Sequence, residues 1–326
     1  MSPVLRSAVT GIGGYLPPQR VSNDDLAEFV DTSHEWIVER TGIHARRRAP
    51  DDVPVSELAV EAARRALADA GRTAAELDLI VVATTTPDQT FPATAAIVQR
   101  KLGAPVGVAF DVQAVCSGFV YALTVADGFV ARGQSKCCLV IGAEEMTRLM
   151  DWSDRGTCVL FGDGAGAVVL EPVEGQGTSA DRGILSSALR CDGSKQELLY
   201  VDGGVSTTGT VGKLRMAGNQ VFRHAIINIS EAIEAAAAKA GVSVAEVDWF
   251  VPHQANTRIL AGVATRLGIP EEKVVTTIAE HANTSAASIP LAMDVAWRDG
   301  RLKRGDLVLV EAMGGGLTWG ACLLRL

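Results

Sequence analysis

The sequence predicts an α/β protein made of two duplicated halves, each with a mostly parallel sheet and right-handed crossovers. Residues 66–82 and residues 236–252 align at an offset of 170, with eight of 17 positions identical. Each copy reads as the end of a helix, a glycine stop, a short acidic turn and an apolar strand. The same order of elements continues in both halves over roughly 150 residues, which chance explains poorly.

Each copy goes on with a helix ending in Leu-Gly, a strand, a loop, another helix and further apolar strands. The paired strands are expected at residues 106–112 and 273–278, 136–145 and 306–313, and 166–172 and 320–326. We place the join in the glycine-rich stretch 171–183, which gives a first half of residues 1–172 and a second half of residues 173–326. Residues 189–212 fit neither copy and are expected to form an irregular insertion over the second half.

Two glycine-rich stretches invite a nucleotide-binding interpretation and fail it. "GIGGYLPP" at residues 11–18 has Leu16 where a G-x-G-x-x-G motif needs its third glycine, and no helix follows. "FGDGAGAVVL" at residues 161–170 leads into a strand, whereas a phosphate site needs a helix N-terminus. We therefore expect these glycines to serve turns and close backbone packing.

Composition narrows the class of protein. Of 326 residues, 48% are hydrophobic and 21% charged, so a sizeable core is expected. The net charge of −8 argues against general nucleic-acid binding, although a local basic patch for an acidic partner remains compatible with it. Neither the six cysteines nor the five histidines show metal-ligand spacing, so no metal is expected, and the cysteine usage is typical of a reduced cytoplasmic protein. No membrane helix or signal peptide is expected.

Cys116 stands where an apolar strand gives way to a buried helix, in "DVQAVCSGFVYALTVADGFV". A free cysteine at such a place is often only a small buried hydrophobe. The alternative is a nucleophile whose thiolate is favoured by the helix N-terminus. The residue alone does not decide between them.

Polar side chains follow two strands expected in the second half. His253 and Asn256 follow one strand, and His281 and Asn283 follow the next, at the position that matches the Cys116 loop. Each has an ordinary interpretation as a helix cap or loop residue. Ligands favour the carboxyl ends of parallel strands, and the two halves face each other across a pseudo-twofold axis, so we expect these residues to meet Cys116.

Cysteine, histidine and asparagine suit one kind of chemistry together. A thiolate accepts an acyl group as a thioester. Asn283 and a neutral His253 are two N–H donors for the oxygen of an enolate, and an enolate formed by loss of CO2 needs no base. The glycines of "EAMGGGLTWG" add backbone N–H groups that, with the Cys116 amide, suit a tetrahedral oxyanion, although a flexible hairpin is the ordinary alternative.

These residues lie in longer motifs that resemble the β-ketoacyl-acyl carrier protein synthase III family, the initiating condensing enzymes of type II fatty acid synthesis. The motifs include "DTSHEWIVERTGIHARR", "SDRGTCVLFGDGAGAVVLE", "VPHQANTRI" and "HANTSAAS", and the likeness covers essentially the whole chain. The resemblance implies a thiolase-like fold with five αβαβα layers. It also implies a decarboxylative condensation of an acyl-coenzyme A primer, such as acetyl-coenzyme A, with malonyl-acyl carrier protein.

The resemblance also implies residue roles. Cys116 would carry the acyl group, His253 and Asn283 would stabilise the enolate, and the Cys116 and Gly315 amides would form the oxyanion hole. The family's coenzyme A site would map to Trp36, Arg40, Arg155, Asn219 and Asn256, and its acyl pocket to Phe91, Phe161, Leu199 and Met313, with Phe91 reaching across a homodimer. Acidic carrier protein would dock on Arg223, Arg258 and Arg266. Taken alone, Trp36 and Arg40 are equally compatible with packing and with a solvated charge.

The chain departs from the family pattern at three places, Ala282, Met313 and Leu317, which puts primer choice in doubt. Three rival functions remain. A thiolase needs a second thiol just before the C-terminal glycines, where Ala312 and Met313 stand instead. A related Cys-His-Asn enzyme of alkylquinolone, polyketide or hydroxymethylglutaryl-coenzyme A synthesis is harder to separate. A non-catalytic carrier-protein-binding scaffold is disfavoured by the intact trio.

Overall fold

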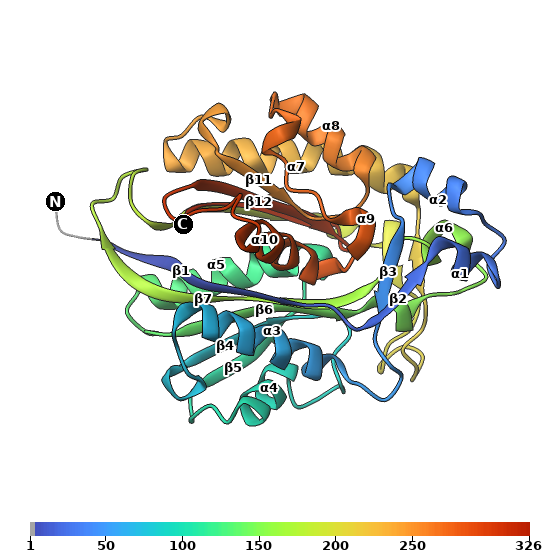
Figure 1. Cartoon of the computed structure of the whole chain (residues 1–326), viewed down its shortest axis with the longest axis horizontal. Coiled ribbons are helices and arrows are strands. Elements are labelled where there is room, and N and C mark those ends of the chain that lie inside the picture. Colours follow the sequence, from blue (N-terminus) through green and yellow to red (C-terminus); the bar gives the residue numbers. More distant parts are fainter. Residues whose placement is uncertain (1–3) are drawn as a thin grey trace.

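The computed structural model describes residues 4–326, and it forms five layers, αβαβα (Figure 1). Each sheet is built from one half of the chain. The first sheet has the strand order β1-β7-β6-β4-β5, with β1 (Val4–Tyr15), β7 (Asp163–Gly175), β6 (Cys138–Glu145), β4 (Leu79–Ala83) and β5 (Val108–Val112). The second has the order β11-β12-β13-β8, with β11 (Trp249–Pro252), β12 (Leu307–Gly314), β13 (Thr318–Arg325) and β8 (Gly183–Cys191).

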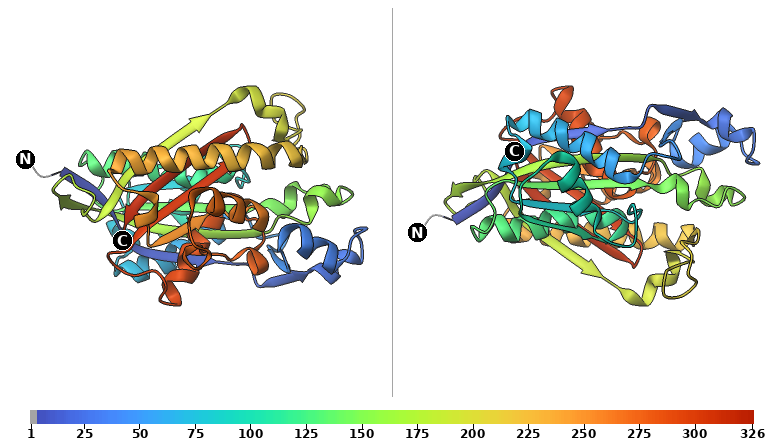
Figure 2. Two further views of the ribbon diagram at one scale, coloured as in Figure 1. Left: turned by 90° about the horizontal axis from the view of Figure 1, so that it is seen from above. Right: turned by 90° about the horizontal axis from the view of Figure 1, so that it is seen from below.

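Helices occupy the other three layers. The first sheet is covered outside by α3 (Val55–Ala70) and α4 (Thr94–Leu102), and the second by α7 (Gly218–Ala240) and α8 (Thr257–Leu267), with α7 running along the strands in Figure 2. Between the sheets lie α5 (Gly118–Ala131) and α10 (Ser288–Arg298). Both central helices are dominated by apolar and small residues because both faces are buried.

The expectation of mostly parallel sheets is wrong. Parallel pairing joins β4 to β5, β4 to β6 and β11 to β12, but β7 runs antiparallel to β1 and β6, and β13 runs antiparallel to β12 and β8. Only residues 315–317 connect β12 to β13, which is too short for the crossover that a parallel pair requires.

The strand expected at residues 273–278 is also absent as a strand. One parallel bridge joins Phe250 to Val274, and the Val275 N–H donates to the Phe250 carbonyl at 2.8 Å. A short turn of helix (Glu271–Lys273) precedes this bridge and α9 (Ile278–His281) follows it, so the chain curls away after a single contact.

Glycines let the layers approach closely, as their sequence context predicts. A Cβ on Gly11 of β1 would overlap the backbone of Ala66 in α3, and a Cβ on Gly166 of β7 would lie 2.7 Å from the Cβ of Pro290 in α10. Any side chain there would push a helix off the sheet.

Residues 176–182 connect β7 of the first sheet to β8 of the second. Strand β7 runs three residues past the predicted boundary at residue 172, so 1–172 and 173–326 remain a proposed division. The insertion after β8 is less irregular than expected, because β9 (Leu199–Val201) pairs with β10 (Leu214–Met216).

One end of the layered body carries smaller elements, which form a projection beyond the sheets (Figure 1). They are β2 (Gln19–Ser22), β3 (Ala45–Arg48), α1 (Asn23–Ala27), α2 (His34–Thr41) and α6 (Arg155–Cys158). Within residues 4–326 no helix is both long enough and apolar enough to cross a bilayer.

Candidate active site

A pocket of about 490 Å³ opens beside α2, α7 and α8 and reaches the three residues that the sequence singles out. Cys116, His253 and Asn283 all line it. They come from a loop after β5, the end of β11 and the turn after α9, so the fold brings together residues far apart in the chain. The predicted meeting of the three side chains in one cavity is therefore what the structure shows.

Cys116 lies in a short turn of helix (Val115–Ser117) immediately before α5 and is 4% exposed. The residue before it, Val115, has a φ of 49°, a left-handed conformation that is costly for a β-branched residue. Burial raises the pKa of the Cys116 thiol to about 12, with a further contribution from the charge of Glu144 and a partial offset from the Ser285 hydroxyl. The thiol therefore keeps its proton at rest, because desolvation outweighs the hydrogen bonds that lower its pKa.

His253 follows β11, and its backbone N–H donates to the Glu311 carbonyl of β12 at 2.8 Å. Its Nδ1 lies 2.6 Å from the Ser288 hydroxyl, which accepts the Gln254 backbone N–H at 3.3 Å. Because these are the contacts of that hydroxyl, its O–H is best oriented to donate a hydrogen bond to Nδ1. Nδ1 is then the acceptor, and the ring proton is on Nε2. Burial lowers the pKa of His253 to about 3, so the imidazole is neutral and presents an N–H donor.

Asn283 is held by backbone and side chain alike. Its N–H donates to the Leu160 carbonyl at 2.9 Å, and its carbonyl accepts the Gly162 N–H at 3.0 Å. Its side-chain oxygen accepts the Ser285 backbone N–H at 2.9 Å. That bond fixes which end of the carboxamide is oxygen, and it leaves the NH2 group as the end available to a ligand.

The turn around Asn283 is strained. Ala282 has a φ of 56° with a ψ of −163°, and Ser285 has a φ of 50°. Together with Val115 these are the non-glycine residues with positive φ among residues 4–326, and all three flank catalytic candidates. Strained backbone of this kind clusters at functional sites, where the surrounding structure holds it in place.

The glycine hairpin between β12 and β13 abuts the cysteine loop. A Cβ on Gly314 would lie 2.6 Å from the Cys116 backbone nitrogen, so only glycine allows this approach. The Ser117 hydroxyl donates to the Thr318 hydroxyl at 2.8 Å, and Thr318 in turn donates to the Gly315 carbonyl at 3.0 Å. These bonds tie Gly315 to the loop that carries Cys116.

The mouth of the pocket is aromatic and basic. The Arg40 guanidinium lies 4.5 Å from the centre of the Trp36 ring, and that of Arg155 lies 5.3 Å from it. Asn256 caps α8 by accepting the Arg258 N–H at 2.8 Å, and its side-chain nitrogen donates to the Arg40 carbonyl at 3.0 Å. An indole with two guanidinium groups close to it suits a flat ring with phosphate attached.

Comparison with known proteins fixes the family. Residues 110–193 match the family model described as 3-oxoacyl-[acyl-carrier-protein] synthase III, and residues 237–326 match the model of its C-terminal part. The β-ketoacyl-[acyl-carrier-protein] synthase III of Caulobacter vibrioides is 77% identical over 322 residues, 99% of this chain and 100% of the relative. The chain belongs to the β-ketoacyl-[acyl-carrier-protein] synthase III family.

Other relatives and solved structures agree. The synthase III of Hyphomonas neptunium is 62% identical, over 98% of this chain and 99% of that protein. The crystal structure of the Aquifex aeolicus 3-oxoacyl-[acyl-carrier-protein] synthase III superposes with a TM-score of 0.91 at 47% identity, covering 98% of this chain and 100% of that one. A priming β-ketosynthase from the R1128 polyketide pathway gives a TM-score of 0.92 at 38% identity, covering 100% and 98%.

As a synthase III with a thiolase-like fold, the protein is an acyl-transferring condensing enzyme that carries out the initiating condensation of fatty acid synthesis. The thiolase and scaffold alternatives are thereby set aside. Among residues 4–326 no three histidine, cysteine, aspartate or glutamate side chains are grouped to hold a metal ion.

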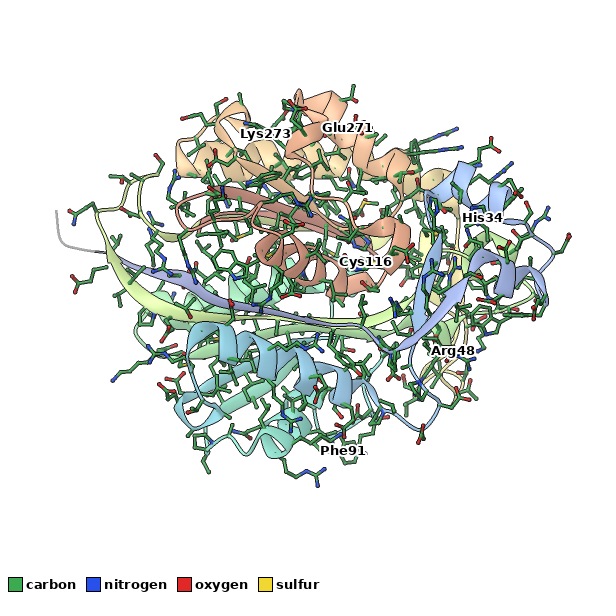
Figure 3. The ribbon with its side chains drawn as sticks, viewed as in Figure 1. His34, Arg48, Phe91, Cys116, Glu271 and Lys273 are labelled. Atoms are coloured by element: carbon green, nitrogen blue, oxygen red, sulfur yellow. The ribbon has the colours of Figure 1, made fainter. Side chains whose placement is uncertain are left out.

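Most of the predicted site residues of this synthase III line the pocket. Beyond the trio these are Trp36, Arg40, Phe161, Leu199, Asn219, Asn256, Arg258 and Met313. Arg155 lies at the mouth over Trp36. Arg223 and Arg266 lie outside on exposed positions of α7 and α8. Phe91 is 81% exposed and lies far from Cys116 across the first half (Figure 3).

The sequence reasoning missed four buried residues near the trio: Glu144, Ser285, Ser288 and Glu311. Glu311 lines the pocket, its Oε2 has no hydrogen-bond partner, and burial raises its pKa to about 8. A signal was present, because Glu144 and Glu311 are acidic residues in strands whose other residues, apart from Glu145, are apolar or small. Buried acids without a cation nearby are uncommon and point to function.

Proposed function

We propose that Cys116 accepts the acyl group of an acyl-coenzyme A primer and that Asn283 and His253 stabilise the enolate of the extender. The observation that carries the proposal is the orientation of two donors. The Asn283 oxygen is occupied by Ser285 and His253 Nδ1 by Ser288, so an NH2 and an Nε2–H remain for one ligand oxygen in the pocket of Cys116. Two donors on one oxygen match an enolate.

In the acylation step, the Cys116 sulfur attacks the thioester carbonyl. A carbon–sulfur bond to Cys116 forms, the carbon–sulfur bond to coenzyme A breaks, and the proton lost by the thiol passes through water to the departing coenzyme A thiolate. The tetrahedral oxyanion on the way is assigned to the backbone N–H groups of Cys116 and Gly315, supported by the hairpin that abuts the cysteine loop. One such donor typically contributes about 2.7–4 kcal/mol to lowering the barrier.

In the condensation step, the extender is malonyl-acyl carrier protein. Its carbon–carbon bond to the carboxylate breaks, CO2 leaves, and the electron pair becomes an enolate on the thioester oxygen between Asn283 and His253. The enolate carbon attacks the acyl-Cys116 carbonyl, and Cys116 leaves as a thiolate that must regain a proton. Neutral donors suit this step because they stabilise the negative oxygen without quenching the carbanion. Every step in this scheme is carried by protein groups.

Coenzyme A is proposed to bind at the mouth, with its adenine between Trp36 and Arg155 and a phosphate on Arg40. The grouping of the indole and both guanidinium groups supports this placement, and the Arg155 guanidinium, 5.3 Å from the ring centre, has to move away from the indole to admit the adenine. Asn219 and Asn256 line the channel at positions suited to the amides of the pantetheine arm. Acidic acyl carrier protein is assigned to Arg223, Arg258 and Arg266, which give the entrance local positive charge on a chain of net charge −8.

The primer is proposed to be acetyl or another short acyl group, in a protein that works in the cytoplasm. Phe161, Leu199 and Met313 line the pocket, and Phe91 is assigned to the acyl pocket of a second copy in a homodimer. A ring that is 81% exposed favours such a partner, because a phenylalanine left in water loses its burial energy. The departures from the family pattern at Ala282, Met313 and Leu317 keep a longer or branched primer as the second candidate.

A panel of acyl-coenzyme A primers with malonyl-acyl carrier protein tests this function. We expect 3-oxoacyl-acyl carrier protein from acetyl-coenzyme A and falling rates with longer chains. Trp36→Ala should raise KM for acyl-coenzyme A and leave kcat nearly unchanged. No product with any primer would overturn the proposal, and a preference for long primers would support the second candidate.

A further inference from the structure

The hairpin tip between β12 and β13 has little rigidity of its own, because residues 314–316 are all glycine. Glycine restricts its backbone less than any other residue. The tip is nevertheless closely packed. A Cβ on Gly314 would lie 2.6 Å from the Cys116 backbone nitrogen, and a Cβ on Gly315 would lie 2.7 Å from the Leu199 carbonyl oxygen. A flexible segment in so narrow a place needs bonds from outside to hold one geometry.

Two backbone N–H groups in this region are left without acceptors. Among the hydrogen bonds of residues 4–326, none has the N–H of Cys116 or of Gly315 as its donor, although both residues are buried. A buried donor without a partner is costly. Two such donors on facing segments, one of them on the nucleophile itself, are the arrangement expected where an oxygen of the substrate binds.

Thr318 connects the two segments that carry these donors, the cysteine loop (113–117) and the hairpin tip (314–317). Its hydroxyl lies 3.0 Å from the carbonyl oxygen of Ala114 and 3.0 Å from that of Gly315. It accepts from the Ser117 hydroxyl at 2.8 Å, which leaves its own proton for the two carbonyls. Among residues 4–326, the hydrogen bonds that join the loop to the hairpin all pass through this hydroxyl.

The other bonds of the hairpin tip point elsewhere. The Leu317 N–H donates to the Asp192 carbonyl at 3.1 Å, and the Asp192 N–H donates to the Leu317 carbonyl at 2.9 Å. These two bonds fasten the tip to the segment after β8, and the pairing of Gly314 with Thr318 closes the hairpin itself. Neither contact sets the distance between the tip and Cys116, so that task falls to the Thr318 hydroxyl.

The Ala114 carbonyl also supports the strained turn before the nucleophile. It accepts the Ser117 backbone N–H at 3.1 Å and lies 2.7 Å from the Ser117 hydroxyl, which closes the turn around Val115 with its φ of 49°. The Cys116 N–H belongs to the peptide group that follows Val115, so this turn sets its direction. A hydrogen bond from Thr318 to Ala114 therefore supports the turn that directs one donor, and its bond to Gly315 holds the segment that carries the other.

We propose that Thr318 is a positioning residue, which holds the N–H groups of Cys116 and Gly315 at the spacing that one oxyanion requires. Thr318 lies outside the set of residues that line the pocket, so it acts through the loop and the tip. The inference deepens the proposed function, because it rests on the oxyanion hole assigned there. Donors of this kind lose their effect when they are displaced, and a shift on the order of 1 Å can cost about 100-fold in rate.

Two reactions of Cys116 separate an effect on the oxyanion hole from an effect on the sulfur. With p-nitrophenyl acetate, the sulfur attacks a carbonyl carbon, an oxyanion forms, and p-nitrophenolate leaves. With iodoacetamide, the sulfur displaces iodide from a saturated carbon, and no oxyanion forms. Thr318→Val should therefore slow acetylation by roughly 10- to 100-fold and leave alkylation within about twofold of normal. Mass spectrometry of the Cys116 peptide measures both rates.

Three further variants make the comparison specific. Thr318→Ser keeps the hydroxyl and should restore acetylation to within about threefold of normal. Thr124→Val is the matched control, because the Thr124 hydroxyl donates to the Val120 carbonyl of its own helix at 2.9 Å, and both rates should stay normal. Ser117→Ala removes the hydroxyl that donates to Thr318 and should slow acetylation alone, by about threefold. It decides the matter should Thr318→Val fail to fold.

Two results would overturn the inference. One is a normal rate of acetylation in Thr318→Val or in Ser117→Ala. The other is an equal loss of acetylation and alkylation in Thr318→Val, because the substitution then disturbs the sulfur and not the oxyanion hole.

The two reagents contain no coenzyme A, which keeps this test separate from that of the proposed function. Acetylation of Cys116 by p-nitrophenyl acetate without transfer from acetyl-coenzyme A would overturn the proposed function and leave the role of Thr318 standing. Transfer from acetyl-coenzyme A that is equally fast in Thr318→Val would do the reverse.

Discussion

The backbone N–H of Ser285 donates to the side-chain oxygen of Asn283 at 2.9 Å and thereby sets the orientation of that carboxamide. The NH2 end is the end left for a ligand. Ser285 also connects this turn to β6, because its hydroxyl donates to Glu144 at 3.0 Å.

Asn283→Asp is expected to keep the bond from Ser285 and to lose the N–H donor. Condensation should fall by roughly 100- to 1000-fold, the effect of removing one oxyanion donor. Transfer of an acetyl group to the protein should continue at a rate close to normal. Single-turnover measurements of the two half-reactions check this, with Asn283→Ala as the comparison. Normal condensation in either variant would contradict the enolate assignment.

Ser288→Ala should release the His253 ring from its fixed tautomer. We expect kcat for condensation to fall about tenfold, with KM for the extender nearly unchanged, because positioning is lost and binding is not. Ser288→Thr retains a hydroxyl and should restore much of the rate. Equal loss in both variants would indicate a packing defect instead of a tautomer effect.

Ala282→Gly should stabilise the protein. The backbone at φ 56° and ψ −163° is accessible to glycine and costs alanine about 1–3 kcal/mol. Glycine also makes the unfolded chain more flexible, which lowers the free energy of unfolding by roughly 0.4–1 kcal/mol. The expected net increase in the free energy of unfolding is therefore about 1 kcal/mol. Denaturant unfolding measures it. Ala287→Gly, at an ordinary φ of −76°, is the control and should destabilise.

Glu311→Gln should change how stability depends on pH. The pKa of Glu311 rises from 4.5 to about 8 on folding, so the folded state holds a proton that the unfolded state releases. Its contribution to stability is therefore full below pH 4.5 and is lost as pH rises to about 8. The variant should be more stable than the unaltered protein above pH 8, by on the order of 5 kcal/mol, and this advantage should shrink toward pH 5. A constant difference across pH would contradict the burial of an ionisable group there.

The catalytic trio could be predicted from the sequence because the signals that mark its residues are local. His253 directly follows an apolar strand and Cys116 lies in the loop after another, and strand ends of an α/β fold converge. The duplication at an offset of 170 also predicts two α/β halves, each with its own sheet. These conclusions need only periodicity and order along the chain, whereas the five-layer arrangement is implied by the family resemblance.

The supporting residues could not be predicted because their contacts are long-range. Ser285 meets Glu144 across 141 residues, and nothing near either residue indicates the other. The missing strand after Phe250 has a similar cause, since residues 273–278 have strand composition but pair at a single bridge. Antiparallel pairing of β7 with β6 depends on which sheet edge the chain returns to, which apolar patterning does not specify.

The most direct test of the account is the mass of the Cys116 peptide after acetyl-coenzyme A and again after malonyl-acyl carrier protein. The account predicts one acetyl group on Cys116 in the first sample, and in the second sample its loss together with formation of 3-oxobutanoyl-acyl carrier protein. An unmodified Cys116 peptide in the first sample, with condensation product still formed in the second, would contradict it.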